Sequence, residues 1–146
     1  MVQKLQTLFS VLVCYRHNLH MLHWKVVGHH FEGAHTLLDS YVSKFNTFID
    51  EIGEMILSMD GNPLTLQECI DIVTQLDQHI LIIESGEDYD STRVYNALDI
   101  MFTDLYNLYT EISKDCEFTD CTSVLDEHKY WLRIEGKYKN KKRMKN

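Results

Sequence analysis

The fold is decided by the stretch FEGAHTLLDSYVSKFNTFIDEIGEMILSM, residues 31–59, which carries two patterns on one predicted helix. The first pattern is a seam of apolar residues that recur three and four positions apart, the spacing of a helix packed in a bundle. Its members are Leu38, Tyr41, Phe45, Phe48, Ile52, Met55 and Met59. The residues Gly61, Asn62 and Pro63 follow and predict the end of this helix.

Three further long helices are predicted from similar apolar seams, over residues 2–27, 91–113 and 116–138. One proline and six glycines in 146 residues leave few breaks, which favours long helices over short strands. At this length we expect one domain with a buried core. In the last helix, the side chains expected to face inward are Phe118, Cys121, Leu125 and Leu132.

A long connection, residues 60–90, separates the second helix from the third. Thr65 and Glu68 have the spacing of a capping box, which predicts that a short helix begins there. A connection of this length can cross the whole bundle, so the second and third helices are expected to run parallel. The expected fold is therefore all-α, a ferritin-like four-helix bundle with a short extra helix in the crossover.

Charge and composition restrict the cellular compartment in which the protein is expected. The net charge is −8, and no apolar run reaches the length of a membrane span, so no membrane contact is expected. The apolar stretch from Leu8 to Val13 has no small-residue cleavage site after it, which argues against a signal peptide. The four cysteines have neither zinc-site nor redox-motif spacing. They are expected to be free thiols in a reducing cytoplasm.

The second pattern of residues 31–59 is a set of metal-ligating side chains on the side away from the apolar seam. His35 and Asp39 are four residues apart, and so are Asp50 and Glu54, so each pair shares one side of the helix. Fifteen residues separate the pairs, which is roughly 22 Å at about 1.5 Å per residue. One helix therefore cannot bring both pairs to one metal. Two copies packed antiparallel about a two-fold axis can, and the symmetry makes the site twice.

His23 and Trp24 lie near the end of the first helix, where a short turn leads back beside the start of the second. A donor set of imidazole and carboxylate suits non-haem iron. A charged face in contact with solvent is the alternative, and the pattern alone gives the two interpretations about equal weight.

A family resemblance favours the metal site. The succession of His23-Trp24, Gly28, Phe31, His35, Asp39, Asp50, Glu54, Gly61 and Pro63 resembles the signature of the Dps family, the mini-ferritins or DNA-binding proteins from starved cells. His128, Trp131 and Leu132 resemble the last helix of that family.

The resemblance implies a hollow dodecamer with a di-iron ferroxidase centre at each two-fold interface. It implies that His23, His35 and Asp39 come from one subunit and that Asp50 and Glu54 come from its partner. Trp24 would lie against the site and intercept radicals.

The activity implied is oxidation of Fe(II) to Fe(III), with hydrogen peroxide as the preferred oxidant and without release of hydroxyl radical. Ferric mineral would collect in the cavity, and DNA would be protected from oxidative damage. Family members admit iron through acidic three-fold pores near the start of the last helix. The candidates here are Glu117, Asp120, Asp126 and Glu127, and ordinary surface acids are an equally weighted alternative for each.

A di-iron site inside a single bundle is a different arrangement, used by the long-chain ferritins. It needs a glutamate on the first helix and Glu-x-x-His motifs. Glu32 and His35 have that spacing, but residues 1–31 contain no Asp or Glu, which argues against such a site.

The last ten residues raise a second possible function. They include six basic residues, so the domain is expected to span residues 1–136 and a disordered tail to span 137–146. Such a tail can bind DNA phosphates without sequence specificity, which would place the protein at the nucleoid. The basic residues are Lys137, Lys139, Lys141, Lys142, Arg143 and Lys145. A merely solubilising tail, and a DNA-compacting shell with little or no ferroxidase activity, remain as alternatives.

The other histidines are expected to be structural or exposed. They are His17, His20, His29, His30, His79 and His128, of which His20 lies one turn from His23.

Overall fold

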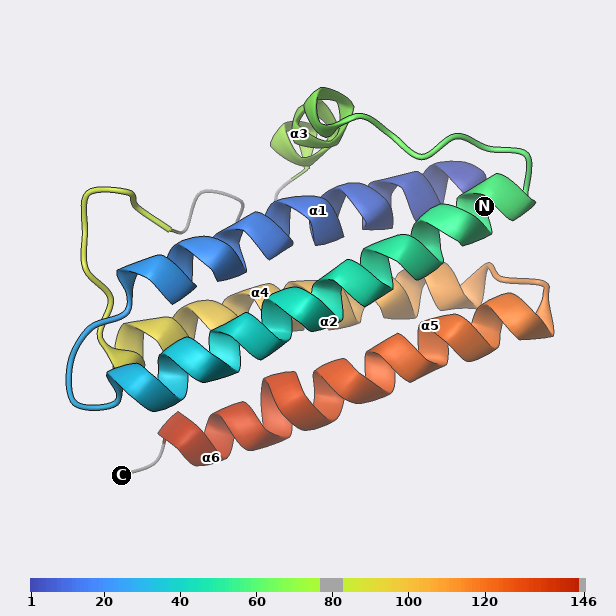
Figure 1. Ribbon diagram of the computed structural model, residues 1–146. Coiled ribbons are helices and arrows are strands. Elements are labelled where there is room, and N and C mark those ends of the chain that lie inside the picture. The colour runs from blue at the N-terminus through green and yellow to red at the C-terminus, as the bar shows by residue number, and fades with distance from the viewer. Residues whose placement is uncertain (77–82, 145–146) are drawn as a thin grey trace.

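The computed structural model describes residues 1–76 and 83–144, and it confirms an all-α four-helix bundle with an extra helix in the crossover (Figure 1). Val2–Lys25 form α1, Phe31–Ser58 form α2 and Ser91–Lys114 form α4. The fourth long helix is made of three segments in succession, which are α5 (Thr119–Trp131), the π-helical segment η1 (Leu132–Lys139) and α6 (Asn140–Met144). The short α3 in the crossover spans Leu66–Gln75. His79 and Lys145 lie outside the described residues.

The crossover runs the whole length of the bundle. At its start, the Gln6 side chain near the beginning of α1 donates to the carbonyl of Asn62. At its end, the Tyr89 N–H donates to the Lys25 carbonyl at the end of α1, and the Val27 N–H donates to the Tyr89 carbonyl. Because the connection returns to the end where α2 began, α2 and α4 run parallel, as expected (Figure 1).

The start of α3 is fixed by the predicted capping box. The Thr65 hydroxyl accepts from the Glu68 N–H, and the Glu68 carboxylate accepts from the Thr65 N–H. These two bonds satisfy amides that the first turn of a helix otherwise leaves unpaired. Cys69 and Val73 then face α1 and are fully buried.

The apolar seams predicted from the sequence form the core. On α2 every member except Met59 is buried, and Met59 is partly buried against the same core. Phe118 is an exception on the last helix, because it precedes α5 and is 59% exposed, whereas Cys121, Leu125 and Leu132 are buried.

All four cysteines are free thiols, as predicted. Within the described part of the chain, no helix is long and apolar enough to cross a membrane.

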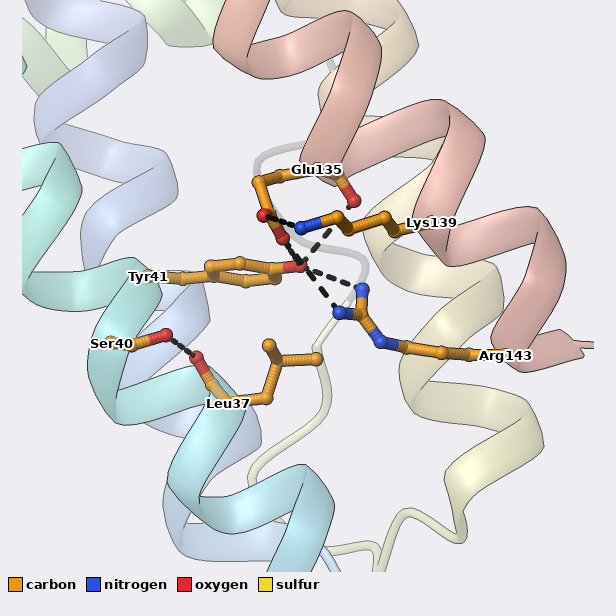
Figure 2. A network of polar contacts seen from close by, with 6 residues as sticks. All are labelled: Leu37, Ser40, Tyr41, Glu135, Lys139 and Arg143. Atoms are coloured by element: carbon orange, nitrogen blue, oxygen red, sulfur yellow. Dashed lines mark hydrogen bonds and ion pairs between the residues drawn. The ribbon is translucent and has the colours of Figure 1, made fainter.

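The expected disordered tail is wrong for residues 137–144, which continue the last helix across the bundle. Asn140 is buried, and its side-chain amide donates to the Tyr95 carbonyl on α4. Arg143 donates to the Tyr41 hydroxyl on α2 at 3.0 Å (Figure 2). These contacts hold the segment in place, so the expected boundary between residues 136 and 137 falls inside a helix.

The Glu135 side chain contacts two basic residues of the C-terminal segment and Tyr41 of α2 (Figure 2). Its carboxylate pairs with Lys139 at 2.6 Å and lies 3.7 Å from Arg143, while the Tyr41 hydroxyl is 3.5 Å away. Burial of Tyr41 raises the pKa of its phenol to about 12, although the nearby Arg143 acts in the opposite direction. The basic C-terminal residues are therefore partly neutralised within the fold.

Gly136 lies at a close contact between η1 and α4. A Cβ at this position would lie 2.4 Å from a ring carbon of Phe102, which is itself fully buried. Only a residue without a side chain fits this approach without displacing the ring.

We predict that Gly136→Ala destabilises the fold by about 1–3 kcal/mol, because the new methyl group overpacks the core. The matched control is Gly33→Ala on α2, where a Cβ meets no heavy atom within 4 Å. That substitution should stabilise the protein by roughly 0.5–1 kcal/mol through helix propensity. Urea denaturation of both variants measures the difference, and equal stability of the two would contradict the packing described here.

Candidate metal centre

Two of the five predicted ligands, His23 and His35, lie face to face between the end of α1 and the start of α2. Their rings are stacked, with centroids 3.7 Å apart and planes inclined by 19°. Nδ1 of His23 lies 2.9 Å from the backbone carbonyl of His35, and Nδ1 of His35 lies 2.8 Å from the backbone carbonyl of His23. This reciprocal pair fixes both ring orientations.

The hydrogen bonds also fix which nitrogen of each histidine is available. A carbonyl oxygen only accepts, so each neutral ring must carry its proton on Nδ1. The lone pair is then on Nε2, which makes no hydrogen bond within the described residues. A histidine held by its Nδ1–H to a carbonyl and free at Nε2 is the usual arrangement of a metal-ligating imidazole.

The three predicted carboxylates are exposed on α2, on the side away from the core. Asp39 lies one turn after His35, and its charge raises the proton affinity of His20, although burial and neighbouring cations lower the pKa of His20 on balance. Asp50 and Glu54 lie toward the other end of the same uninterrupted helix. Along the helix axis, Asp50 therefore lies roughly 22 Å and Glu54 roughly 28 Å from His35, at about 1.5 Å per residue.

No complete metal site forms within the described part of one chain. Among these residues, no three His, Cys, Asp or Glu side chains come close enough together to hold a metal ion. The structure brings His23 and His35 together and leaves the pair Asp50 and Glu54 apart from them. Glu32 lies three residues before His35 in the first turn of α2, and it is exposed.

Trp24 follows His23 on α1, is 60% exposed, and contacts two further histidines of that helix. Its ring is stacked on His20, with centroids 4.9 Å apart, and meets His17 edge-on at 6.4 Å. His20 is in turn 6.3 Å from His23. The end of α1 therefore presents an aromatic surface next to the candidate ligands, which sequence reasoning had only partly anticipated.

The four acids considered for an iron pore have different surroundings. Asp120 lines a hollow of about 300 Å³ between α2 and α5 together with Glu51 and Glu54. Asp126 instead shares a hollow of about 150 Å³ with two cations, Lys129 and Arg133. Both remaining acids, Glu117 and Glu127, are exposed. Of the four, Asp120 is thus the one that shares a hollow with a candidate ligand.

A buried polar pair lies near this acidic surface, and sequence reasoning missed it. Tyr109 of α4 and His128 of α5 are both fully buried, and the phenol oxygen is 2.7 Å from Nδ1 of the imidazole. Among the described residues, the Nε2 of His128 has no hydrogen-bond partner but lies 3.5 Å from a carboxylate oxygen of Glu51. Burial, and then the charge of Lys44, lowers the pKa of His128 to about 3. The only signal in the sequence is that His128 lies three residues after Leu125, on the side of the last helix expected to face inward.

Comparisons with known proteins show the family and the fold of the chain. The model of the ferritin-like domain family matches residues 2–119. The chain is 35% identical over 54 residues to the "DNA protection during starvation protein" of Listeria innocua, a match that spans 36% of this chain and 35% of that protein. It is 28% identical over 115 residues to "DNA protection during starvation protein 2" of Bacillus anthracis, covering 66% of this chain and 77% of that one.

Among solved structures, Dps from Staphylococcus aureus has the same fold, with a TM-score of 0.84 and 21% identity. The superposition covers 99% of this chain and 95% of the staphylococcal one. At this identity the likeness concerns the fold alone. The match to the Listeria protein, in contrast, spans only about a third of that protein's length.

The low pKa of His128 predicts a specific loss of stability in acid. An unfolded histidine binds a proton near pH 6.5, whereas folded His128 does so only near pH 3. Its contribution is therefore present above pH 6.5 and is lost as the pH falls toward 3, by about 2 kcal/mol at pH 5. In His128→Gln, which cannot titrate, the fall in unfolding free energy between pH 7 and pH 5 should be smaller by that amount. Parallel pH profiles of the two proteins would contradict this.

Proposed function

Because the chain belongs to the ferritin-like family, as one of its Dps proteins, we propose that it oxidises Fe(II) to Fe(III) at a site shared between two copies. His23, His35 and Asp39 of one copy and Asp50 and Glu54 of the other would hold the iron. Ferric product would be stored in a hollow oligomer, for which twelve copies are the expected number.

The observation that carries this proposal is the incompleteness of the site within one chain. Two imidazoles are held with Nε2 free, and a carboxylate lies one turn away. The other two carboxylates are on the same straight helix, too far along it to reach them. An antiparallel second copy of α2 supplies the missing pair, and it receives the same completion in return.

The donor set suits the chemistry. Imidazole nitrogen and carboxylate oxygen bind both Fe(II) and Fe(III), and the negative charge of the carboxylates favours the more highly charged product. Hydrogen peroxide accepts two electrons, so two Fe(II) ions and two protons reduce one peroxide to two waters. With two irons at one site, each gives one electron and no hydroxyl radical is left over. Trp24 is exposed and stacked on His20, one turn from His23, and would take up any radical that does escape.

Removal of iron and peroxide together would protect DNA, which agrees with the names of the Listeria and Bacillus relatives. For iron uptake, Asp120 is the strongest of the four candidate acids, because its hollow also contains Glu54. Glu117, Asp126 and Glu127 have no such connection to a candidate ligand.

A second function, binding of DNA through the C-terminal segment, rests on the two lysines that this helix leaves exposed without an acidic partner in the described residues. Lys139 and Arg143 pair with Glu135, and Lys137 lies over the Tyr106 ring. Lys141 and Lys142 are exposed on α6, where they would meet phosphates, and the Tyr138 ring under Lys142 is itself exposed. We propose this as an added role, weak because the overall charge is −8.

The double variant Asp50→Asn, Glu54→Gln should slow Fe(II) oxidation by hydrogen peroxide by at least about tenfold. Loss of the hydrogen bonds that support a metal ligand typically lowers metal affinity or activity 10–100-fold. Loss of the ligands themselves should lower the rate at least as much. Both substitutions preserve shape and remove charge. The matched control is Glu32→Gln, a third acid of α2, which should leave the rate unchanged. Ferric absorbance after anaerobic loading and addition of peroxide measures the rate.

Two outcomes would count against the shared site. Equal rates in the double variant and the wild type would remove Asp50 and Glu54 from the chemistry. A loss of activity in Glu32→Gln would instead point to the Glu32–His35 spacing and a site inside one bundle.

For DNA, the variant Lys141→Gln, Lys142→Gln should bind duplex DNA more weakly and reduce the salt slope of the affinity by about 1 per lysine. Truncation at Gly136 is unsuitable as a test, because it also removes the buried Asn140. Lys114→Gln with Lys129→Gln removes the same charge elsewhere and serves as the control. Equal binding by both double variants in gel-shift titrations would exclude the C-terminal lysines as the DNA-binding element.

A further inference from the structure

The pair formed by Tyr109 and His128 has a defined direction of hydrogen bonding. The neutral imidazole carries one proton, and its Nε2 faces a carboxylate oxygen of Glu51 at 3.5 Å. A lone pair on Nε2 would be repelled by that carboxylate, so the proton belongs on Nε2. Nδ1 is then the acceptor, and the Tyr109 hydroxyl donates to it over 2.7 Å. The three groups form a line from the core to the surface, since the Glu51 side chain is 35% exposed.

The phenol of Tyr109 has no contact with solvent. Burial raises its pKa well above the ordinary value, so the phenol does not lose its proton to water. Its hydrogen-bond partner among the described residues is His128. Any reaction that removes an electron from Tyr109 must therefore deliver the proton to that imidazole.

Aromatic rings connect the pair to the rest of the bundle. The His128 ring is stacked on Phe48 of α2, with centroids 3.9 Å apart and planes inclined by 19°. Phe48 meets Trp131 edge-on at 5.5 Å, and Trp131 is partly accessible. Tyr109 is thus buried but close to other rings that lie between it and the surface.

We propose that Tyr109 and His128 form a proton-coupled redox pair, in which Tyr109 gives one electron to a strong oxidant while its phenolic proton moves to Nδ1 of His128. The oxidant is hydroxyl radical, formed when a single Fe(II) reduces hydrogen peroxide, so its source rests on the proposed function. The radical gains the electron and becomes hydroxide, and Tyr109 becomes a neutral tyrosyl radical beside an imidazolium. Fe(II) then returns an electron, the proton goes back to the phenol, and Fe(III) is the product.

The proton transfer is downhill although His128 is a weak base in this site. A phenol that has lost an electron is a far stronger acid than imidazolium, even one whose pKa burial has lowered to about 3. The Glu51 carboxylate faces the imidazolium at Nε2, and this attraction opposes the repulsion from Lys44. The pair would thus turn a damaging oxidant into ordinary ferric product.

The test generates the oxidant in two ways in the full-length protein. In one arm, Fe(II) and hydrogen peroxide react and the sample is frozen for electron paramagnetic resonance. In the other, azidyl radicals from pulse radiolysis oxidise the iron-free protein, so the result does not depend on ferroxidase activity. Wild type is compared with Tyr109→Phe and with Tyr130→Phe, an exposed control tyrosine.

We expect a tyrosyl signal in the azidyl arm that is lost in Tyr109→Phe and retained in Tyr130→Phe. In His128→Gln the radical should form more slowly, and its high-field g-tensor should change because the hydrogen bond to the radical oxygen is altered. In the wild type, transfer to D2O should remove the coupling of one exchangeable proton, and this measurement needs no variant to fold.

A tyrosyl signal that is unchanged in Tyr109→Phe, or no tyrosyl signal in the azidyl arm, would overturn the redox pair. A signal lacking the exchangeable coupling would overturn the role of His128. If the azidyl arm gives the Tyr109 radical and the iron arm does not, the pair stands and the proposed source of its oxidant fails. The double variant Asp50→Asn, Glu54→Gln tests the proposed oxidation of Fe(II) independently of this pair.

Discussion

The length and continuity of α2 are the constraint on which the rest of the structure depends. Its 28 residues form one uninterrupted helix, which keeps His35 and Asp39 apart from Asp50 and Glu54. A helix cannot shorten to bring the pairs together, so one chain by itself cannot place all four side chains at one metal ion. The second copy in the proposed site thus follows from the rigidity of the backbone and the positions of four side chains.

The opposite side of α2 holds these candidate ligands in place. Its apolar seam is buried against α1 and the last helix, so α2 cannot rotate about its axis without exposing Phe45 and Phe48. The carboxylates are therefore held outward by the core. The reciprocal hydrogen bonds between His23 and His35 join the end of α1 to α2 and orient both rings. Packing and ligand orientation depend on the same contact between α1 and α2.

Much of this was predictable because it is local in sequence. The capping box at Thr65 and Glu68 and the i, i+4 pairs of α2 involve residues only three or four apart. The docked C-terminal helix was not predictable in this way. Six basic residues indicate a solvated tail, whereas its contacts join Asn140 to Tyr95 and Arg143 to Tyr41, which are distant in sequence. The Tyr109–His128 pair was missed for the same reason, since only the fold brings α4 and α5 together there.

Mixed oligomers test most directly whether the metal site is shared between copies. Subunits with His35→Ala lack one half of each site, and subunits with Asp50→Asn, Glu54→Gln lack the other half, so each oligomer alone should be inactive. When the two are unfolded, mixed in equal amounts and reassembled, half of the two-fold pairs are mixed, and each of these holds one intact site. We predict recovery of about one quarter of the wild-type rate of Fe(II) oxidation. No recovery, from mixed oligomers shown to be assembled, would contradict a site shared between copies.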